Sequence, residues 1–151
     1  MIRWLTSATF GYKELNVKRR SMQMRWLERF SDYAYALLRL VTGFMFCFHG
    51  AQKILGVLSN FRPPVGSQIW FGGIIELFGG LAVMLGVQTR AAAFLCSGMM
   101  AVAYFQFHWK FQPGPQFFPA INEGELAALY CFVFLYIACR GGGRWSLDKK
   151  G

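Results

Sequence analysis

Apolar residues are grouped along the chain into four long runs, separated by short polar or proline-rich stretches. The runs cover residues 33–58, 69–87, 91–109 and 122–139. An α-helix rises ~1.5 Å per residue, so about 20 apolar residues cross the ~30 Å hydrocarbon core of a bilayer. The pattern therefore predicts an all-α fold, an integral membrane bundle of four transmembrane helices.

The connecting stretches indicate how the four helices follow one another. Residues 59–68 carry two adjacent prolines and a glycine, which end a helix and form a loop. A turn at residues 88–90 is so short that the second and third helices must form an antiparallel hairpin. Residues 110–121 combine three prolines with aromatic side chains, which is typical of a loop at the membrane interface.

Two basic segments flank the four-helix domain, which we assign to residues 33–140. Residues 1–32 are basic and partly amphipathic, with Trp26 and Phe30 at helical spacing, and this segment is either a helix on the membrane surface or a charged anchor. Residues 141–151 form a basic tail. No cleavable signal peptide is expected, because the first apolar run follows some thirty mixed residues.

Composition and charge support a membrane protein and give it an orientation. The chain is 55% hydrophobic and only 15% charged, with 16 Lys and Arg against 7 Asp and Glu. The basic excess lies mostly outside the apolar runs, so we expect the lipid bilayer, and no nucleic acid, as its partner. Twelve of the 16 basic residues lie before residue 33, at Arg90 or after residue 139, which predicts that both termini are cytoplasmic.

Ionisable residues inside apolar runs are the candidate chemistry, because charge is costly in a bilayer and needs a partner. Helix rise puts His49 and Lys53 in the first run at about the same depth as Glu76 in the second. His108 lies near the end of the third run and Glu125 near the beginning of the fourth. We therefore expect polar groups of all four helices to meet in the outer half of the bundle, where shifted pKa values would allow proton exchange.

Each of these residues also has a purely structural interpretation. Glu76 with Lys53 or His49 is equally an ion pair that holds two helices in register. His108 is equally an interfacial residue. Arg39 is expected to snorkel to the inner headgroups, and Arg90 to act as a topology anchor.

Small residues surround Glu76 in the second run. Gly72, Glu76 and Gly80 repeat every four residues, with Gly73 and Gly79 beside them. A helix face this bare predicts close approach of a neighbouring helix. The four cysteines lie inside apolar runs without CxxC or zinc-ligand spacing, so we expect small core residues and no metal site.

Four sequence blocks resemble the DoxX family. They are LLRLVTGFMFCFHGAQKI at residues 37–54, the glycine-rich stretch from Gly72 to Ala92, NEGE at Asn122 to Glu125 and GGRWSLD at residues 142–148. The resemblance implies a four-helix bacterial inner-membrane protein in a redox setting, because similar proteins include small subunits of a thiosulfate:quinone oxidoreductase and members of thiol-handling complexes. By analogy it suggests His49, Glu76 and His108 for proton exchange, and for binding Arg39, Gly50, Lys53, Arg90 and Glu125.

Three functions are compatible with these observations. The first is binding of a quinone or small sulfur or oxidant species, with proton exchange in the chain and electrons from a protein partner, as in a subunit of a quinone-linked oxidoreductase. Haem or copper is disfavoured, because the Met and Cys residues near the two histidines, which could act as further ligands, are just as easily ordinary core residues. The second is a non-catalytic subunit or assembly factor. The third is transport of a small solute or protons, for which a homo-oligomer would make the pathway.

Overall fold

The computed structural model describes residues 26–148, and within that range every regular element is helical. The all-α prediction is confirmed. By its internal contacts the chain divides after Ala34, and residues from Tyr35 onward contain the helical bundle. The amphipathic segment expected before residue 33 lies mostly outside the described residues, and of it only a helical turn at residues 26–28 and the start of the first long helix are seen.

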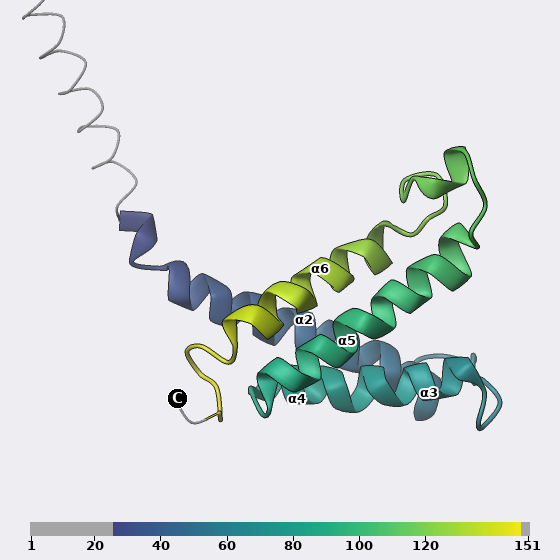
Figure 1. The fold of residues 1–151 in the computed structure, drawn as a ribbon. Helices are drawn as coiled ribbons and strands as arrows, with labels where there is room; N and C mark the ends of the chain where they lie inside the picture. Colours follow the sequence, from purple (N-terminus) through teal and green to yellow (C-terminus); the bar gives the residue numbers. More distant parts are fainter. Residues whose placement is uncertain (1–25, 149–151) are drawn as a thin grey trace, which may run out of the picture. The chain divides into compact units, whose positions relative to one another are not determined.

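The bundle is built from four helical rods (Figure 1). The first rod is α2, Ser31–Ile54, and the second joins α3, Gln68–Ile74, through the π-helix η1, Ile75–Gly79, to α4, Gly80–Leu85. The third rod joins α5, Thr89–Ala103, to a second π-helix, η2, Tyr104–Trp109. A 3-10 turn, η3, Pro115–Phe117, lies in the loop that follows. The fourth rod is α6, Glu125–Arg140. Ser31–Ile54, Gln68–Leu85 and Thr89–Trp109 are long and apolar enough to cross a membrane.

The fourth rod is shorter than the other three. With 16 residues, α6 reaches ~24 Å. It packs along α5 and runs antiparallel to it, from Asn122 beside His108 to Arg140 beside Arg90 (Figure 1). The helical membrane bundle expected from the sequence is therefore present.

The first rod ends four residues before the predicted boundary. The helix stops at Ile54, and Gly56 and Leu58 then take positive φ angles of 71° and 52°. A left-handed backbone cannot continue a right-handed helix, so residues 55–58 belong to the loop.

Glycines bring α2 into backbone contact with the second rod. A Cβ atom at Gly43 would lie 2.5 Å from the Met84 nitrogen, and one at Gly50 or Gly80 would overlap the backbone of Leu77 or Cys47. The predicted close approach on the glycine face is confirmed at Gly80. Gly72 on the same face has open space instead.

Aromatic rings fill the centre of the bundle. Phe46 of α2 lies 4.6 Å from Phe134 and 5.4 Å from Tyr130, both of α6, measured between ring centroids. Val83 and Cys96 are buried in the same cluster. Cys96 is thus a core residue as expected, but Cys139, near the exposed end of α6, is exposed, so the expectation that all four cysteines are core residues is wrong there.

Arg39 is completely buried, which contradicts the expectation that it snorkels to the headgroups. Its guanidinium donates hydrogen bonds to the carbonyls of Val83 and Met84 at 2.7 and 2.6 Å, and to those of Arg144 and Trp145 at 3.2 and 2.8 Å. Both of the first two carbonyls lie in the last turn of α4, where helical donors run out, although that of Val83 also accepts from the Gly86 N–H at 3.2 Å. Arg39 therefore joins α4 to the C-terminal segment, because the fork of a guanidinium reaches several acceptors at once.

The C-terminal segment is docked rather than extended. The Asp148 carboxylate accepts hydrogen bonds from the backbone N–H groups of Gln88 at 2.7 Å and Thr89 at 2.9 Å, which begin α5. The Thr89 side chain and these two N–H groups hold the pKa of Asp148 below its ordinary value of 3.8. The Leu147 and Asp148 N–H groups donate to the Leu85 and Gly86 carbonyls in return.

Arg90 does more than the topology anchoring expected of it. Its guanidinium donates to the Cys139 carbonyl at 2.5 Å, to that of Ala138 at 3.1 Å and to that of Arg140 at 3.3 Å. These carbonyls end α6 and need donors. We call this part of the bundle, with Tyr35, Arg39, Arg90 and residues 141–148, the tail-docking end.

Candidate functional site

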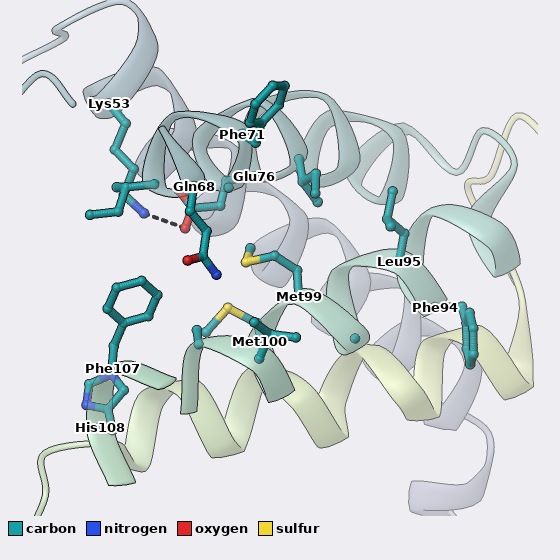
Figure 2. A pocket seen from close by; sticks show the side chains of 16 residues that line it. Lys53, Gln68, Phe71, Glu76, Phe94, Leu95, Met99, Met100, Phe107 and His108 are labelled. Carbon is teal, nitrogen blue, oxygen red and sulfur yellow. Dashed lines mark hydrogen bonds and ion pairs between the residues drawn. The ribbon is translucent and has the colours of Figure 1, made fainter. Parts of the chain in front are cut away.

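A cavity of about 660 Å³ opens between the second and third rods (Figure 2). Its walls are mainly apolar and come from α3 and η1 on one side and from α5 and η2 on the other. The larger apolar side chains are those of Phe71, Ile75, Phe94, Leu95, Met99, Met100 and Phe107. Small-molecule sites in proteins commonly have this size and this apolar character.

Lys53 and Glu76 form an ion pair at one side of the cavity (Figure 2). The Lys53 Nζ and Glu76 Oε1 atoms are 2.5 Å apart. The Lys53 side chain is 28% exposed and the Glu76 side chain 8%. The pair joins the end of α2 to η1, and Lys53 keeps part of its surface open to the cavity.

His108 and Gln68 add further polar groups to the cavity wall. His108 is half-buried, and its Nδ1 atom lies 3.2 Å from the Asn122 carbonyl oxygen. Gln68 begins α3 and hydrogen-bonds Gln106 of η2. The cavity wall thus carries an ammonium, a carboxylate, an imidazole and an amide, and its other side chains are apolar.

Both π-helices lie beside this cavity, and each contributes one ionisable residue to its wall. Glu76 is in η1 and His108 is in η2. A π-helix inserts one residue into a helical turn and redirects the side chains there, and such segments are frequent at functional sites. The two local distortions turn these side chains toward the same space.

Three of the predicted site residues, Lys53, Glu76 and His108, line the same cavity. His49 does not line it; it is half-buried and makes no hydrogen bond within the described residues. His49 lies one helical turn, ~6 Å along the axis, before Lys53 on nearly the same face of α2, and the cavity reaches only the later turn. Gly50 serves helix packing against Leu77.

The other three predicted residues lie elsewhere. Glu125 is exposed at the first position of α6 and does not line the cavity. Arg39 and Arg90 belong to the tail-docking end, where backbone carbonyls occupy their guanidinium groups. The cavity therefore gathers polar groups from three rods rather than from four.

Sequence reasoning did not single out Gln68, Met99 and Met100, which also line the cavity. Leu95, Met99 and Val102 follow one another at helical spacing, a pattern that core, lipid-facing and cavity positions share. No signal in the sequence separates these possibilities. Within residues 26–148, no group of three or more His, Cys, Asp and Glu side chains has the arrangement of a metal site.

Comparison with known proteins gives one family and two relatives. The sequence model of the DoxX family matches residues 34–109, a range that includes Lys53, Glu76 and His108. An uncharacterised protein of Haemophilus influenzae is 40% identical over 131 residues, which are 84% of this chain and 97% of that protein. The inner membrane protein YqjF of Escherichia coli is 23% identical over 128 residues, 82% of this chain and 95% of that protein. No solved structure matches.

Proposed function

We propose that this protein binds a quinone-like redox molecule in the cavity between its second and third rods. The chain belongs to the DoxX family and is a multi-pass protein of the inner membrane. In this proposal Lys53, Glu76 and His108 exchange protons with the bound molecule, and a partner protein supplies the electrons. In the predicted orientation, the polar residues of the cavity would lie toward the outer side of the bilayer, and its apolar wall would extend inward to Phe94 and Leu95.

The shape and lining of the cavity support an amphipathic ligand that enters from lipid. Phe71, Phe94 and Leu95 line the cavity and are 54–68% exposed, so its rim is open to the surface that faces the membrane. Met99 and Met100 supply polarisable thioethers, which pack well against aromatic rings. A ring with an apolar tail would place the tail along these side chains and its polar oxygens near Glu76.

Proton exchange is the chemistry that the polar part of the cavity offers. Reduction of a quinone to a quinol takes two electrons and two protons, one for each oxygen. Lys53 in its ammonium form and His108 are the groups that can donate a proton or a hydrogen bond to a quinone oxygen. Glu76 is the ion-pair partner of Lys53. When Lys53 has donated a proton, Glu76 takes up another proton and passes it to Lys53.

A partner protein is required by this proposal. The sequence has no CxxC pair and no flavin or dinucleotide fingerprint that would carry electrons. The partner would hold the electron carrier, and this chain would hold the quinone.

The observation that carries the proposal is an apolar, membrane-facing cavity with Lys53, Glu76 and His108 on its wall. We would test it with a photoreactive azidoquinone added to the protein in lipid nanodiscs. Labelling is expected on peptides of residues 68–76 and 94–108, and excess unlabelled quinone should compete with it. Labelling spread evenly over the exposed surfaces of all four rods would contradict the proposal.

Glu76→Gln tests the proton-exchange part separately. Quinone-dependent turnover of the native complex should fall at least tenfold while the protein stays in the membrane at a normal level, because Gln keeps the shape of Glu but cannot take up a proton. Glu125→Gln, which removes an exposed carboxylate outside the cavity, is the matched control. Full turnover in Glu76→Gln would overturn the proton-exchange role.

A non-catalytic subunit is the second candidate, favoured by the 2.5 Å contact of Lys53 with Glu76 across two rods. An ion pair that only holds the rods in register should survive exchange of its partners. The double variant Lys53→Glu with Glu76→Lys would then restore abundance and complex assembly, whereas either single change would lower both. Restored assembly without restored turnover would separate the two roles.

A further inference from the structure

The docked C-terminal segment turns its small polar side chains and its large apolar side chains to opposite sides. The Ser146 hydroxyl donates to the Gly86 carbonyl at 3.0 Å, and the Asp148 carboxylate accepts from the N–H groups that begin α5. Trp145 and Leu147, which alternate with these two residues, are 58% and 70% exposed. Polar groups therefore hold the segment on the bundle, and two large apolar side chains are left on its outer side.

Trp145 has a backbone conformation that is unusual for a large side chain. Its φ angle is 54°, in the left-handed region. That region is uncommon for residues other than glycine, and a bulky residue there carries strain that the surrounding structure must offset. Arg39 donates to the carbonyls of Arg144 and Trp145 at 3.2 and 2.8 Å. The bundle thus fixes the backbone from which the exposed indole projects.

The segment lies where two candidate membrane spans end. One span ends at Leu85 and the next begins at Thr89, so the turn between them lies at a membrane surface. Backbone N–H groups of the segment bind the Leu85 and Gly86 carbonyls beside this turn (Figure 1). Arg39 binds both the segment and the Val83 carbonyl, which is ~3 Å along the axis from the end of its helix. This places the segment at the level of the lipid headgroups.

Basic side chains accompany the two exposed apolar ones. Arg140 and Arg144 are both exposed. The Arg140 guanidinium lies 4.3 Å from the centre of the Tyr35 ring and donates to the Tyr136 hydroxyl at 2.9 Å, which holds it at the tail-docking end. Two lysines follow in the sequence, outside the described residues. Positive charge next to Trp and Leu is the combination that an anionic lipid surface attracts.

We propose that the docked C-terminal segment is a lipid-binding edge of the bundle. Trp145 and Leu147 enter the headgroup region of the adjacent leaflet, and the guanidinium groups of Arg140 and Arg144 bind phosphates of anionic lipids there. An indole has an apolar body and one N–H donor, which suits this depth, and a guanidinium binds phosphate oxygens through its planar fork. A lipid surface is the partner because the segment is fixed at the level where the spans end. This inference does not depend on which molecule fills the cavity.

Tryptophan fluorescence of the full-length protein in lipid nanodiscs tests the position of Trp145. The emission that is lost in Trp145→Phe belongs to this residue. Lipids with a nitroxide on the headgroup should quench that emission about twofold more strongly than aqueous iodide does, because the indole lies among headgroups. Equal or stronger quenching by iodide would place the indole in water, and quenching by neither would place it under protein. Either result would overturn the proposal.

Native mass spectrometry tests the binding of anionic lipid. The protein is released from nanodiscs that contain equal amounts of phosphatidylglycerol and phosphatidylcholine, and the lipids that stay bound are counted. Wild type should retain phosphatidylglycerol preferentially. Arg144→Gln, which leaves the backbone carbonyl that Arg39 binds, should reduce this preference about fivefold, because one charge near the surface is removed.

Lys110→Gln is the matched control for this measurement. It removes an exposed basic side chain from the loop that follows η2 and should keep the preference for phosphatidylglycerol. Three results would overturn the phosphate-binding role: no preference in wild type, an unchanged preference in Arg144→Gln, or an equal reduction in both variants.

Discussion

The tail-docking end and the cavity of this protein use similar side chains for different purposes. At the tail-docking end, Arg39 and Arg90 place their guanidinium groups on the carbonyls that end α4 and α6, and Asp148 accepts from the N–H groups that begin α5. At the cavity, Lys53 and His108 keep hydrogen-bonding capacity on the wall of an open space. A charged residue within an apolar run thus indicates a need for a partner, and that partner is the protein backbone, another side chain or a ligand.

Packing differs in a similar way between the cavity and the contact face of α2 with the second rod. Gly43, Gly50 and Gly80 allow backbone contact between α2 and the second rod. Gly72 and Gly98 line the cavity and have open space where a Cβ atom would be. Substitutions of glycine in the contact face and in the cavity wall should therefore differ in their effect on stability.

The largest effect is expected from Arg39→Leu. The change removes the donors of four backbone carbonyls in a fully buried site, which should cost about 3 kcal/mol of unfolding free energy. Thermal unfolding in detergent and the amount of protein in the membrane measure it. Arg39→Lys keeps the charge but not the fork of donors, so its stability should lie between those of the wild type and Arg39→Leu. An Arg39→Leu variant as stable as the wild type would show that docking of the tail does not need Arg39.

Gly50→Ala should destabilise the bundle by about 2 kcal/mol, because the new methyl group would overlap the Leu77 backbone and push α2 away. The control is Gly72→Ala in α3, where the methyl group meets open space and Ala has the better helix propensity, so stability should be unchanged or slightly higher. Both are measured by thermal unfolding. Equal losses in the two variants would contradict the contrast between contact face and cavity.

Asp148→Ala should cost about 1 kcal/mol at neutral pH, the usual value for a lost helix N-terminal cap. The pKa of Asp148 is lowered in the folded protein, so its contribution is present above the ordinary pKa of 3.8 and is lost as pH falls through the lowered value. The stability difference between wild type and variant should therefore shrink under strongly acidic conditions. A difference independent of pH would mean that the carboxylate is not the group responsible.

The smallest effect on folding is expected from Gly98→Leu, within about 0.5 kcal/mol, because the side chain would enter the cavity rather than the core. Its effect on function should be large, since labelling by the azidoquinone should fall at least tenfold. Leu129→Phe, on the exposed face of α6 outside the cavity, is the control and should change neither property. Undiminished labelling in Gly98→Leu would place the quinone elsewhere.

Part of the candidate site could be predicted from residue depth alone. Counting helix rise along antiparallel runs brought Lys53 and Glu76 to one level and His108 to the same half of the bundle, and all three line the cavity. The count could not show that the cavity leaves out His49, one turn from Lys53, and Glu125, because it specifies neither where packing leaves an open space nor the angle of a side chain around the helix axis. The π-helices, which alter that angle at Glu76 and His108, have no clear sequence signature.

The sequence by itself determined the class of fold, because long apolar runs are stable only as membrane helices and short turns force them to alternate in direction. It also determined which residues carry unusual energetic cost. The tertiary structure decided how that cost is met. Backbone carbonyls compensate Arg39, and Lys53 compensates Glu76. The physical reason is that a buried charge is compensated by atoms distant in the chain, and only packing brings those atoms within hydrogen-bonding distance.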